Sequence, residues 1–272
     1  MSRVLISLIC SALLVVAPSS FAKTVPKVAL IIDDMGYRDT DFHAFELPSH
    51  VAFAILPHTQ HSKRFSAMAD QQGRVVMLHL PMETLHPQNL GPGALLASMN
   101  ANYLIDTFED ALASVPHAVG LNNHMGSKLT QLSFPMTTLM QAVAKHDLFF
   151  VDSRTTRYSK AFTIATEFGI PSVQRKVFLD HDLSEEAIEQ QFDRLVRLSR
   201  KYGEALGIGH PHPQTLAVLQ RRLAAQNDVI FVAVTELLNP QESPRIVRRD
   251  KRKDIGTERL SADAESSVEL SP

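Results

Sequence analysis

The chain has 272 residues, of which 44% are hydrophobic and 21% charged, a composition typical of a globular protein with a sizeable core. Its formal net charge of −2 argues against a nucleic-acid-binding protein, which normally carries a basic excess. Nucleotide binding has no support either, because no apolar run is followed by a glycine-rich phosphate loop of either common type.

The first 22 residues are predicted to be a secretory signal peptide. Arg3 supplies a positive start, residues 4–17 form an apolar stretch, and Ser20 and Ala22 place small residues at the −3 and −1 positions of a cleavage site. The apolar stretch is short for a membrane span, and an uncleaved N-terminal anchor is the alternative. We therefore expect an exported, periplasmic protein after cleavage near Ala22.

The chain has one cysteine, Cys10, inside the predicted signal peptide. Residues 7–9 lack the small residue expected before a lipidated cysteine, which argues against a lipoprotein. The mature chain then has no disulfide and no thiolate ligand, so histidines and carboxylates must hold any metal.

From residue 27 to residue 234, short apolar runs alternate with amphipathic stretches. Strands are predicted at 28–32, 51–56, 75–78, 118–121, 148–151, 173–179, 206–208 and 229–234, and helices at 60–72, 101–115, 135–146, 184–202 and 214–226. This α/β alternation without hairpin signals is typical of a parallel sheet covered by helices, and seven or eight repeats favour a closed barrel. We therefore predict a β/α barrel over residues 23–239.

Two of the predicted helices begin at a capping residue. Asn102, with Asp106 beyond it, opens one, and Ser184 opens another with Glu185 and Glu186 in its first turn. These signals fix where the two helices are expected to start.

After Asn239 the apolar periodicity stops. A basic cluster (Arg245, Arg248, Arg249, Lys251, Arg252 and Lys253) gives way to an acidic end that contains serines. We predict residues 240–272 to be a disordered charged tail. The alternative is an electrostatic tether to anionic lipid or glycan, which is the membrane contact that the sequence allows.

Polar residues stand at the C-terminal side of most predicted strands. They are Asp33 and Asp34, then His79, then Asn122, Asn123 and His124, then Asp152 and Ser153, then Asp180, His181 and Asp182, and finally His210 and His212. Because the C-terminal ends of barrel strands converge on one face, where active sites lie, we expect a site there.

Each polar residue also has an ordinary structural interpretation. Asp180 and Asp182 could cap a turn or helix, and His210 and His212, which flank a proline, could be loop residues. The adjacent Asp33 and Asp34 repel each other, and a cation is the usual way to make both tolerable. The other histidines (His43, His50, His58, His61, His86, His117 and His146) are predicted on the surface, with His58 and His86 nearest the rim.

The sequence motifs around these positions resemble those of a known family. An apolar strand, Asp33-Asp34 and a glycine two residues later resemble the first motif of the polysaccharide deacetylase superfamily. Four further motifs resemble those of its divergent branch of exported bacterial proteins. They are HLPME (79–83), NNHMGS (122–127), VDSRTT (151–156) and GHPHP (209–213). The resemblance covers about residues 26–236.

This resemblance implies a distorted seven-stranded β/α barrel with a divalent metal, usually zinc, at its C-terminal face. A metal-bound water would attack the carbonyl of an acetyl group on a sugar. Asp33 would be the general base, Asp34 and His79 would be metal ligands, and His210 would be the general acid.

The chain departs from the superfamily at two places. Glu83 stands where the second metal histidine is usual, and Asn122-Asn123-His124 replaces an arginine motif whose arginine would orient Asp33. We predict His124 as the third metal ligand, with His181 as the alternative. Asn122, Asn123, Asp152, His181 and His212 are predicted to line the substrate.

Two functions remain open on the sequence alone. The first is a zinc-dependent deacetylase that acts on peptidoglycan or another envelope glycan. The second is a non-catalytic, metal-containing periplasmic module that binds glycan or protein. A metal hydrolase of another bond is a further alternative. The absence of tryptophan disfavours binding of a long glycan in either case.

Overall fold

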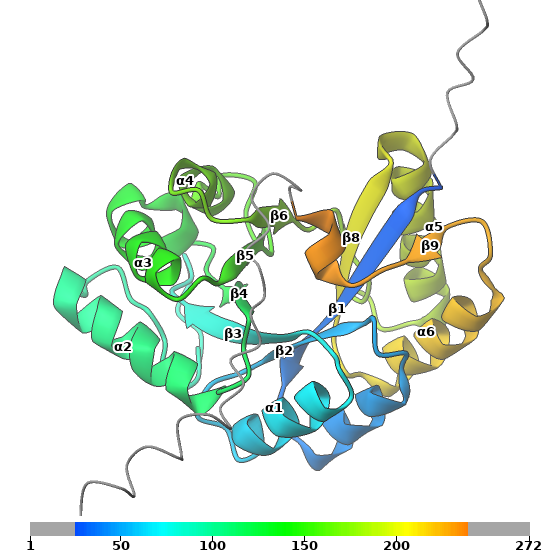
Figure 1. Cartoon of the computed structure of the whole chain (residues 1–272), viewed down its shortest axis with the longest axis horizontal. Helices are drawn as coiled ribbons and strands as arrows, with labels where there is room; N and C mark the ends of the chain where they lie inside the picture. The colour runs from blue at the N-terminus through cyan, green and yellow to red at the C-terminus, as the bar shows by residue number, and fades with distance from the viewer. Residues whose placement is uncertain (1–24, 239–272) are drawn as a thin grey trace, which may run out of the picture.

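The computed structural model describes residues 25–238 (Figure 1). The predicted signal peptide and charged tail lie outside the described residues. Within the described part of the chain, no helix combines the length and apolar character that a membrane span requires.

Within residues 25–238, nine parallel strands form one sheet. They are β1 (Lys27–Met35), β2 (Ala52–Ile55), β3 (Val76–Met82), β4 (Gly120–Met125), β5 (Phe149–Asp152), β6 (Ser172–Gln174), β7 (Val177–Phe178), β8 (Glu204–Gly209) and β9 (Ile230–Phe231). The spatial order is β6-β5-β4-β3-β2-β1-β8-β7, and β9 pairs with the start of β1.

The two edges of this sheet belong to one short segment, residues 172–178. The Arg175 amide donates to the Asp152 carbonyl of β5 at 3.0 Å, and the next amide, Lys176, donates to the Leu206 carbonyl of β8 at 2.8 Å. The segment therefore closes the sheet into a ring by changing partners within two residues. The predicted seven-stranded distorted barrel is confirmed, with its sixth strand split into β6 and β7.

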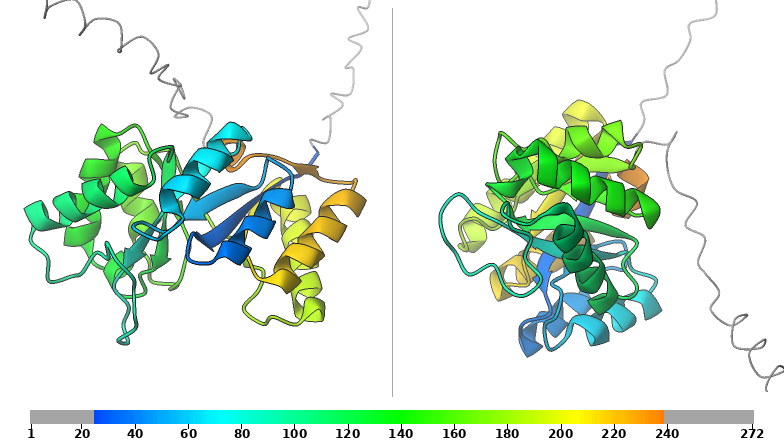
Figure 2. Two further views of the ribbon diagram at one scale, coloured as in Figure 1. Left: turned by 90° about the horizontal axis from the view of Figure 1, so that it is seen from below. Right: turned by 90° about the vertical axis from the view of Figure 1, so that its left-hand side faces the viewer.

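Helices cover the outside of the barrel, with α2, α3 and α4 on one flank and α5 and α6 on the other (Figures 1 and 2). The helices are α1 (Ser62–Gln71), α2 (Ala101–Ser114), α3 (Ser133–Lys145), α4 (Ala161–Glu167), α5 (Glu185–Tyr202) and α6 (Pro213–Ala225). Three 3₁₀ helices are η1 (Asp39–Glu46), η2 (Leu129–Gln131) and η3 (Val234–Leu237).

Three sequence predictions about these elements need correction. Asn100, not Asn102, caps α2, because its extended backbone lets Oδ1 accept from the Tyr103 amide at 3.0 Å. Helix α4 has only seven residues, too few for a periodic pattern, and was not predicted. The last predicted strand shortens to β9, and η3 takes up the rest. The Ser184 cap of α5 is confirmed by its bond to the Ala187 amide.

Alternate residues of each strand enter two separate cores. Ala29 and Ile31 of β1 belong to the cluster inside the barrel, whereas Val28, Leu30 and Ile32 pack against the helices. The same alternation continues to the C-terminal ends of the strands. Polar residues that stand there at inward-facing positions therefore lie inside the barrel at its C-terminal face.

The barrel interior is tightly filled at Gly120. A Cβ at this position would lie 2.4 Å from the Phe149 ring, which occupies that space. Because any side chain at position 120 would displace the ring, the glycine allows Phe149 to pack inside the barrel, directly beneath the polar residues at its C-terminal face.

Candidate active site

A bulge in β1 brings two consecutive carboxylates to the same place. Between Ile32 and Met35, β1 has one residue more than β2, and Asp34 adopts a φ of +57°. In a regular strand, neighbours point to opposite faces, so Asp33 and Asp34 could not share a site. A left-handed non-glycine residue costs about 1–3 kcal/mol and often marks a functional position.

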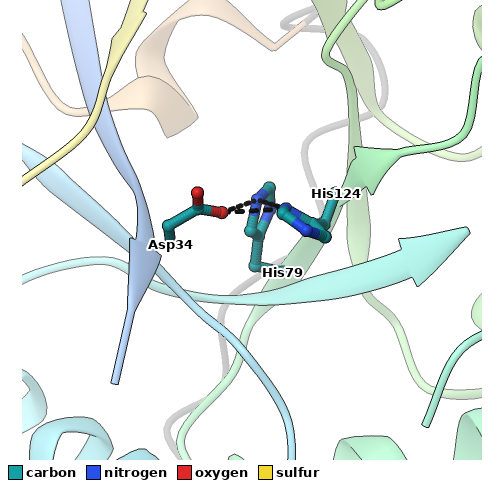
Figure 3. Close-up of side chains that lie close together, drawn as sticks. All are labelled: Asp34, His79 and His124. Carbon is teal, nitrogen blue, oxygen red and sulfur yellow. Dashed lines mark hydrogen bonds and ion pairs between the residues drawn. The ribbon is translucent and has the colours of Figure 1, made fainter. Parts of the chain in front are cut away.

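Asp34, His79 and His124, which we call the Asp34 cluster, converge from three strands (Figure 3). Asp34 Oδ1 lies 3.0 Å from His79 Nε2 and 2.8 Å from His124 Nδ1, and the two ring nitrogens are 3.1 Å apart. His79 and His124 are both on inner rows because their strands pair in register, His79 beside Asn122 and His124 beside Pro81.

The Asp34 cluster fits a divalent metal. Asp34 Oδ1 is buried and has no hydrogen bond of acceptable geometry, although two imidazole nitrogens are near. Zinc bonds of 2.0–2.1 Å would put tetrahedral ligand atoms about 3.3 Å apart, close to the observed separations. Burial tends to raise the pKa of Asp34, but contacts with His124 and His79 outweigh it and hold the pKa far below its usual range.

Asn122 links the Asp34 cluster to Asp33. Its Nδ2 donates to Asp33 Oδ1 at 2.8 Å, and its Oδ1 lies 2.7 Å from His79 Nδ1. Because an ionised carboxylate only accepts, the amide oxygen must face the imidazole, which then donates from Nδ1. This leaves the lone pair of Nε2 directed at the cluster, as metal-binding histidines require. Asn122 therefore holds the orientation of Asp33 through this hydrogen bond.

Asp33 is almost completely buried, at 2% exposure, next to the Asp34 cluster. Its Oδ2 lies 3.7 Å from His79 Nε2. Burial raises the pKa of Asp33 above its ordinary value, against the lowering effect of His79 and His210. A carboxylate with a raised pKa is a better proton acceptor than an ordinary surface aspartate.

His210 lies next to the Asp34 cluster and is held by a buried carboxylate, Asp180. Asp180 Oδ1 lies 2.9 Å from His210 Nδ1, and Asp180 Oδ2 accepts from the His210 amide and from Thr215 Oγ1. His210 Nε2 points to Asp34 Oδ2 at 3.7 Å. Burial tends to lower the pKa of His210, but Asp180 above all raises it to about 9, so the ring holds a proton at neutral pH.

The structure keeps two alternative ligands out of the Asp34 cluster. Glu83 pairs with Lys128 at 2.6 Å and accepts from the Ala97 amide at 2.6 Å, so both oxygens hold the loop after β3. His181 is exposed in the loop before α5. His212 instead lies with Asp180 and His210 in a second group of potential ligand atoms.

Three residues predicted to contact substrate are buried beneath the site instead. Asn122, Asn123 and Asp152 are 0%, 1% and 0% exposed. Asn123 bridges the Ser153 amide and the Met125 carbonyl, and Asp152 accepts from the Arg154 amide and from Ser159 Oγ. Direct substrate contact does not fit these positions, whose polar atoms are taken by the protein.

Sequence reasoning missed Arg175 near the site. It stands where the barrel closes, between β6 and β7, and its guanidinium donates to the Ser153 and Arg154 carbonyls and stacks 4.7 Å from Phe178. Burial lowers its pKa, against the opposing charges of Asp33 and Asp152. The sequence did contain a signal for this position, because the adjacent cations Arg175 and Lys176 interrupt the apolar pattern of the predicted strand 173–179.

One predicted surface histidine is buried. His61 is 9% exposed, stacks 4.9 Å from the Phe65 ring and lies 3.0 Å from Asp39. It precedes α1, and the packing of that helix on the barrel covers it. His86, predicted near the rim, is exposed in the loop after β3.

The polar residues at the C-terminal face of the barrel border a small pocket of about 110 Å³. It is lined by Asp34, Tyr37, Arg38, Asp41, His210, Pro211 and His212. A larger pocket of about 540 Å³ lies at the opposite end, near the starts of β1 and β8. The larger one contains neither of the potential ligand groups found in residues 25–238, so we place the site at the smaller one.

Comparison with known proteins agrees with the fold and the motifs. The divergent polysaccharide deacetylase profile matches residues 30–238. The uncharacterized protein YibQ of Escherichia coli K12 is 38% identical over 215 residues, covering 78% of this chain and 67% of that protein. An uncharacterized protein of Haemophilus influenzae is 38% identical over 206 residues, covering 75% of this chain and 74% of its own length.

A solved structure is also similar. The crystal structure of an uncharacterized protein from Agrobacterium tumefaciens C58 aligns with a TM-score of 0.75 and 25% identity, covering 81% of this chain and 92% of that one. The barrel with polar inner rows at its C-terminal face thus defines a protein of the deacetylase-like α/β class. The chain belongs to the divergent polysaccharide deacetylase family.

Proposed function

We propose that the protein is a metal-dependent hydrolase that removes acetyl groups from an envelope glycan. The observation that carries the proposal is the convergence of a buried carboxylate, Asp33, and an imidazole, His210, on the Asp34 cluster, each 3.7 Å from one of its members. A base and an acid placed around three potential ligands serve acyl transfer, and a binding module needs neither.

The Asp34 cluster would hold the metal, and zinc suits its two imidazoles and one carboxylate. When bound, such an ion polarises an acyl carbonyl and lowers the pKa of a water ligand. Three protein ligands are the number used by catalytic zinc sites, which keep a fourth position open.

Asp33 would take the proton from the attacking water. Asn122 fixes one of its oxygens at 2.8 Å, which leaves Oδ2 on the side of His79. Because Asp33 is buried, its carboxylate exchanges little solvation with water and keeps its orientation during the reaction.

His210 would donate a proton to the leaving group. Asp180 holds Nδ1, so the proton that can be given away is on Nε2, which faces the cluster. With a pKa of about 9, His210 is protonated at neutral pH and matches a poor leaving group such as the amine of an N-acetyl sugar.

The test is acetate release from peptidoglycan fragments, chitin oligomers and an activated acetyl ester, with zinc, cobalt or manganese added. Asp33→Asn is expected to keep the fold and lower the rate by about 100- to 10,000-fold, as expected for a positioned base. His210→Ala should slow amine release more than phenolate release, because only the amine needs an acid. His146→Ala, which changes an exposed histidine just before the start of β5, is the matched control.

Wild type that releases no more acetate than Asp33→Asn on every substrate and metal would contradict the hydrolase. The alternative, a non-catalytic periplasmic module that binds glycan or protein through the same metal-containing barrel, would then be favoured.

We also propose that the protein acts in the periplasm after removal of its signal peptide. The supporting observation is the sequence pattern up to Ala22. The intact mass of protein recovered from a periplasmic fraction should correspond to a chain that begins at Lys23, and recovery of full-length protein in membranes would contradict cleavage.

A further inference from the structure

The loop after β5, residues 153–160, lies beside the proposed active site and is held there by several hydrogen bonds. At its start, Ser153 Oγ lies 3.3 Å from Asn122 Nδ2. Further along, Thr155 Oγ1 donates to the Met125 carbonyl next to His124, at 2.8 Å, and the Lys160 amide donates to the Thr130 carbonyl at 2.8 Å. We call this segment the basic loop.

The base of the basic loop is preformed around one buried carboxylate. Asp152 accepts from the Arg154 amide and from Ser159 Oγ, both at 2.8 Å. Arg154 has a φ of +51°, and its guanidinium donates to the Ser159 and Arg157 carbonyls, so this arginine holds the loop from within. A loop fixed at so many points presents its outer side chains without a large ordering cost.

The outer side chains of the basic loop are cationic and aromatic. Arg157 and Lys160 are exposed, and Tyr158 is 58% exposed with the Arg157 guanidinium 4.7 Å from its ring. Lys160 also reaches Ser133 Oγ, beside Phe134, which is 61% exposed. Apolar rings beside cations suit a sugar face that carries an anionic substituent.

The positive charge of the basic loop is not balanced locally. No acidic residue occurs from 153 to 166, and neither Arg157 nor Lys160 forms an ion pair with any residue of the described chain. Elsewhere, the arginines of α6 are paired with acids of α5, as Arg221 with Glu189. Unpaired cations beside a site attract an anionic ligand at no cost in broken ion pairs.

We propose that the basic loop is a subsite for carboxylate groups, so that the preferred substrate is an acetylated glycan whose sugars carry carboxylates. Arg157 and Lys160 bind the carboxylate, and Tyr158 packs on the neighbouring sugar. This inference rests on the proposed function for the reaction itself, but it can be tested by binding alone.

The test compares two ligands that differ only in charge. A short N-acetylated oligosaccharide that contains muramic-acid-type carboxylates is titrated into the full-length protein, beside the same oligosaccharide with its carboxyl groups reduced to alcohols. The carboxylated form should bind more tightly, and the difference should shrink as salt is raised. Because one exposed ion pair is worth about 0.2–1 kcal/mol, Arg157→Gln should weaken its binding by about 1.4- to fivefold. The Arg157→Gln, Lys160→Gln double variant should weaken it by about 2- to 30-fold.

Arg197→Gln on α5 is the matched control, since Arg197 is an exposed arginine away from the basic loop. Equal binding of the two ligands, or equal weakening by Arg197→Gln, would overturn the subsite. Tighter, Arg157-dependent binding of a phosphate-bearing oligosaccharide would overturn the carboxylate class. Acetate release is measured separately, so a protein that binds the carboxylated ligand as expected but releases no acetate refutes the reaction and not the subsite.

Discussion

The third metal ligand is the point at which this chain departs most from the motifs of the superfamily, and His124→Ala tests it directly. The structure gives His124 Nδ1 distances of 2.8 Å to Asp34 Oδ1 and 3.1 Å to His79 Nε2. Its removal leaves two ligands, which cannot complete a tetrahedral site with one open position.

The size of the effect follows from linkage. Replacing a residue that only supports a ligand costs about 10- to 100-fold in metal affinity, so loss of a ligand should cost at least about 100-fold. At a free zinc concentration 100 times the wild-type Kd, metal stabilises the wild type by about 2.7 kcal/mol, whereas a 100-fold weaker site gains about 0.4 kcal/mol. For a protein of this size these values correspond to rises in Tm of about 5–10 °C and about 1–2 °C.

The assay measures Tm with chelator and with buffered zinc, together with metal content after dialysis. His181→Ala is the matched control and should behave as wild type, because His181 is exposed and outside the Asp34 cluster. A zinc-induced rise in Tm that is intact in His124→Ala and lost in His181→Ala or Glu83→Gln would refute the assignment.

Three further predictions concern residues around the site and the fold. Asn122→Leu, which removes the contacts to Asp33 and His79 at similar volume, should lower kcat strongly and weaken zinc binding by about 10- to 100-fold; unchanged zinc affinity would contradict its role. Burial tends to raise the pKa of Asp180, but contacts with His210 hold it below its ordinary value. Its stabilising contribution is therefore present above about pH 4 and lost as pH falls through the folded-state pKa. In Asp180→Asn, Tm should accordingly fall less steeply at acid pH than in the wild type. An equally steep fall of Tm would refute the contribution of Asp180 to the pH dependence of stability. Arg74→Met leaves three carbonyls, two of them buried, without the guanidinium that now donates to them at 2.7–2.8 Å, and should lower the free energy of unfolding by about 3 kcal/mol in urea denaturation. A loss below about 1 kcal/mol would show that water replaces these bonds.

The sequence by itself determined the class of fold and most of the residues that form the candidate site. Alternation of buried strands and amphipathic helices requires a parallel sheet whose C-terminal ends lie on one face. For that reason Asp34, His79 and His124 could be expected close together from their order along the chain, and the structure brings them within 3.1 Å of one another. Family membership follows from the same motifs.

Tertiary structure alone decided how these residues are arranged around one another. A bulge at Asp34 lets two adjacent carboxylates reach one site. The positive φ that forms this bulge cannot be predicted from the periodicity of the sequence. Asn122 was expected to contact substrate, but its place between Asp33 and His79 depends on the register of β3 and β4. Register, and the closing of the barrel at Arg175, come from contacts between residues far apart in the chain, which local patterns do not contain.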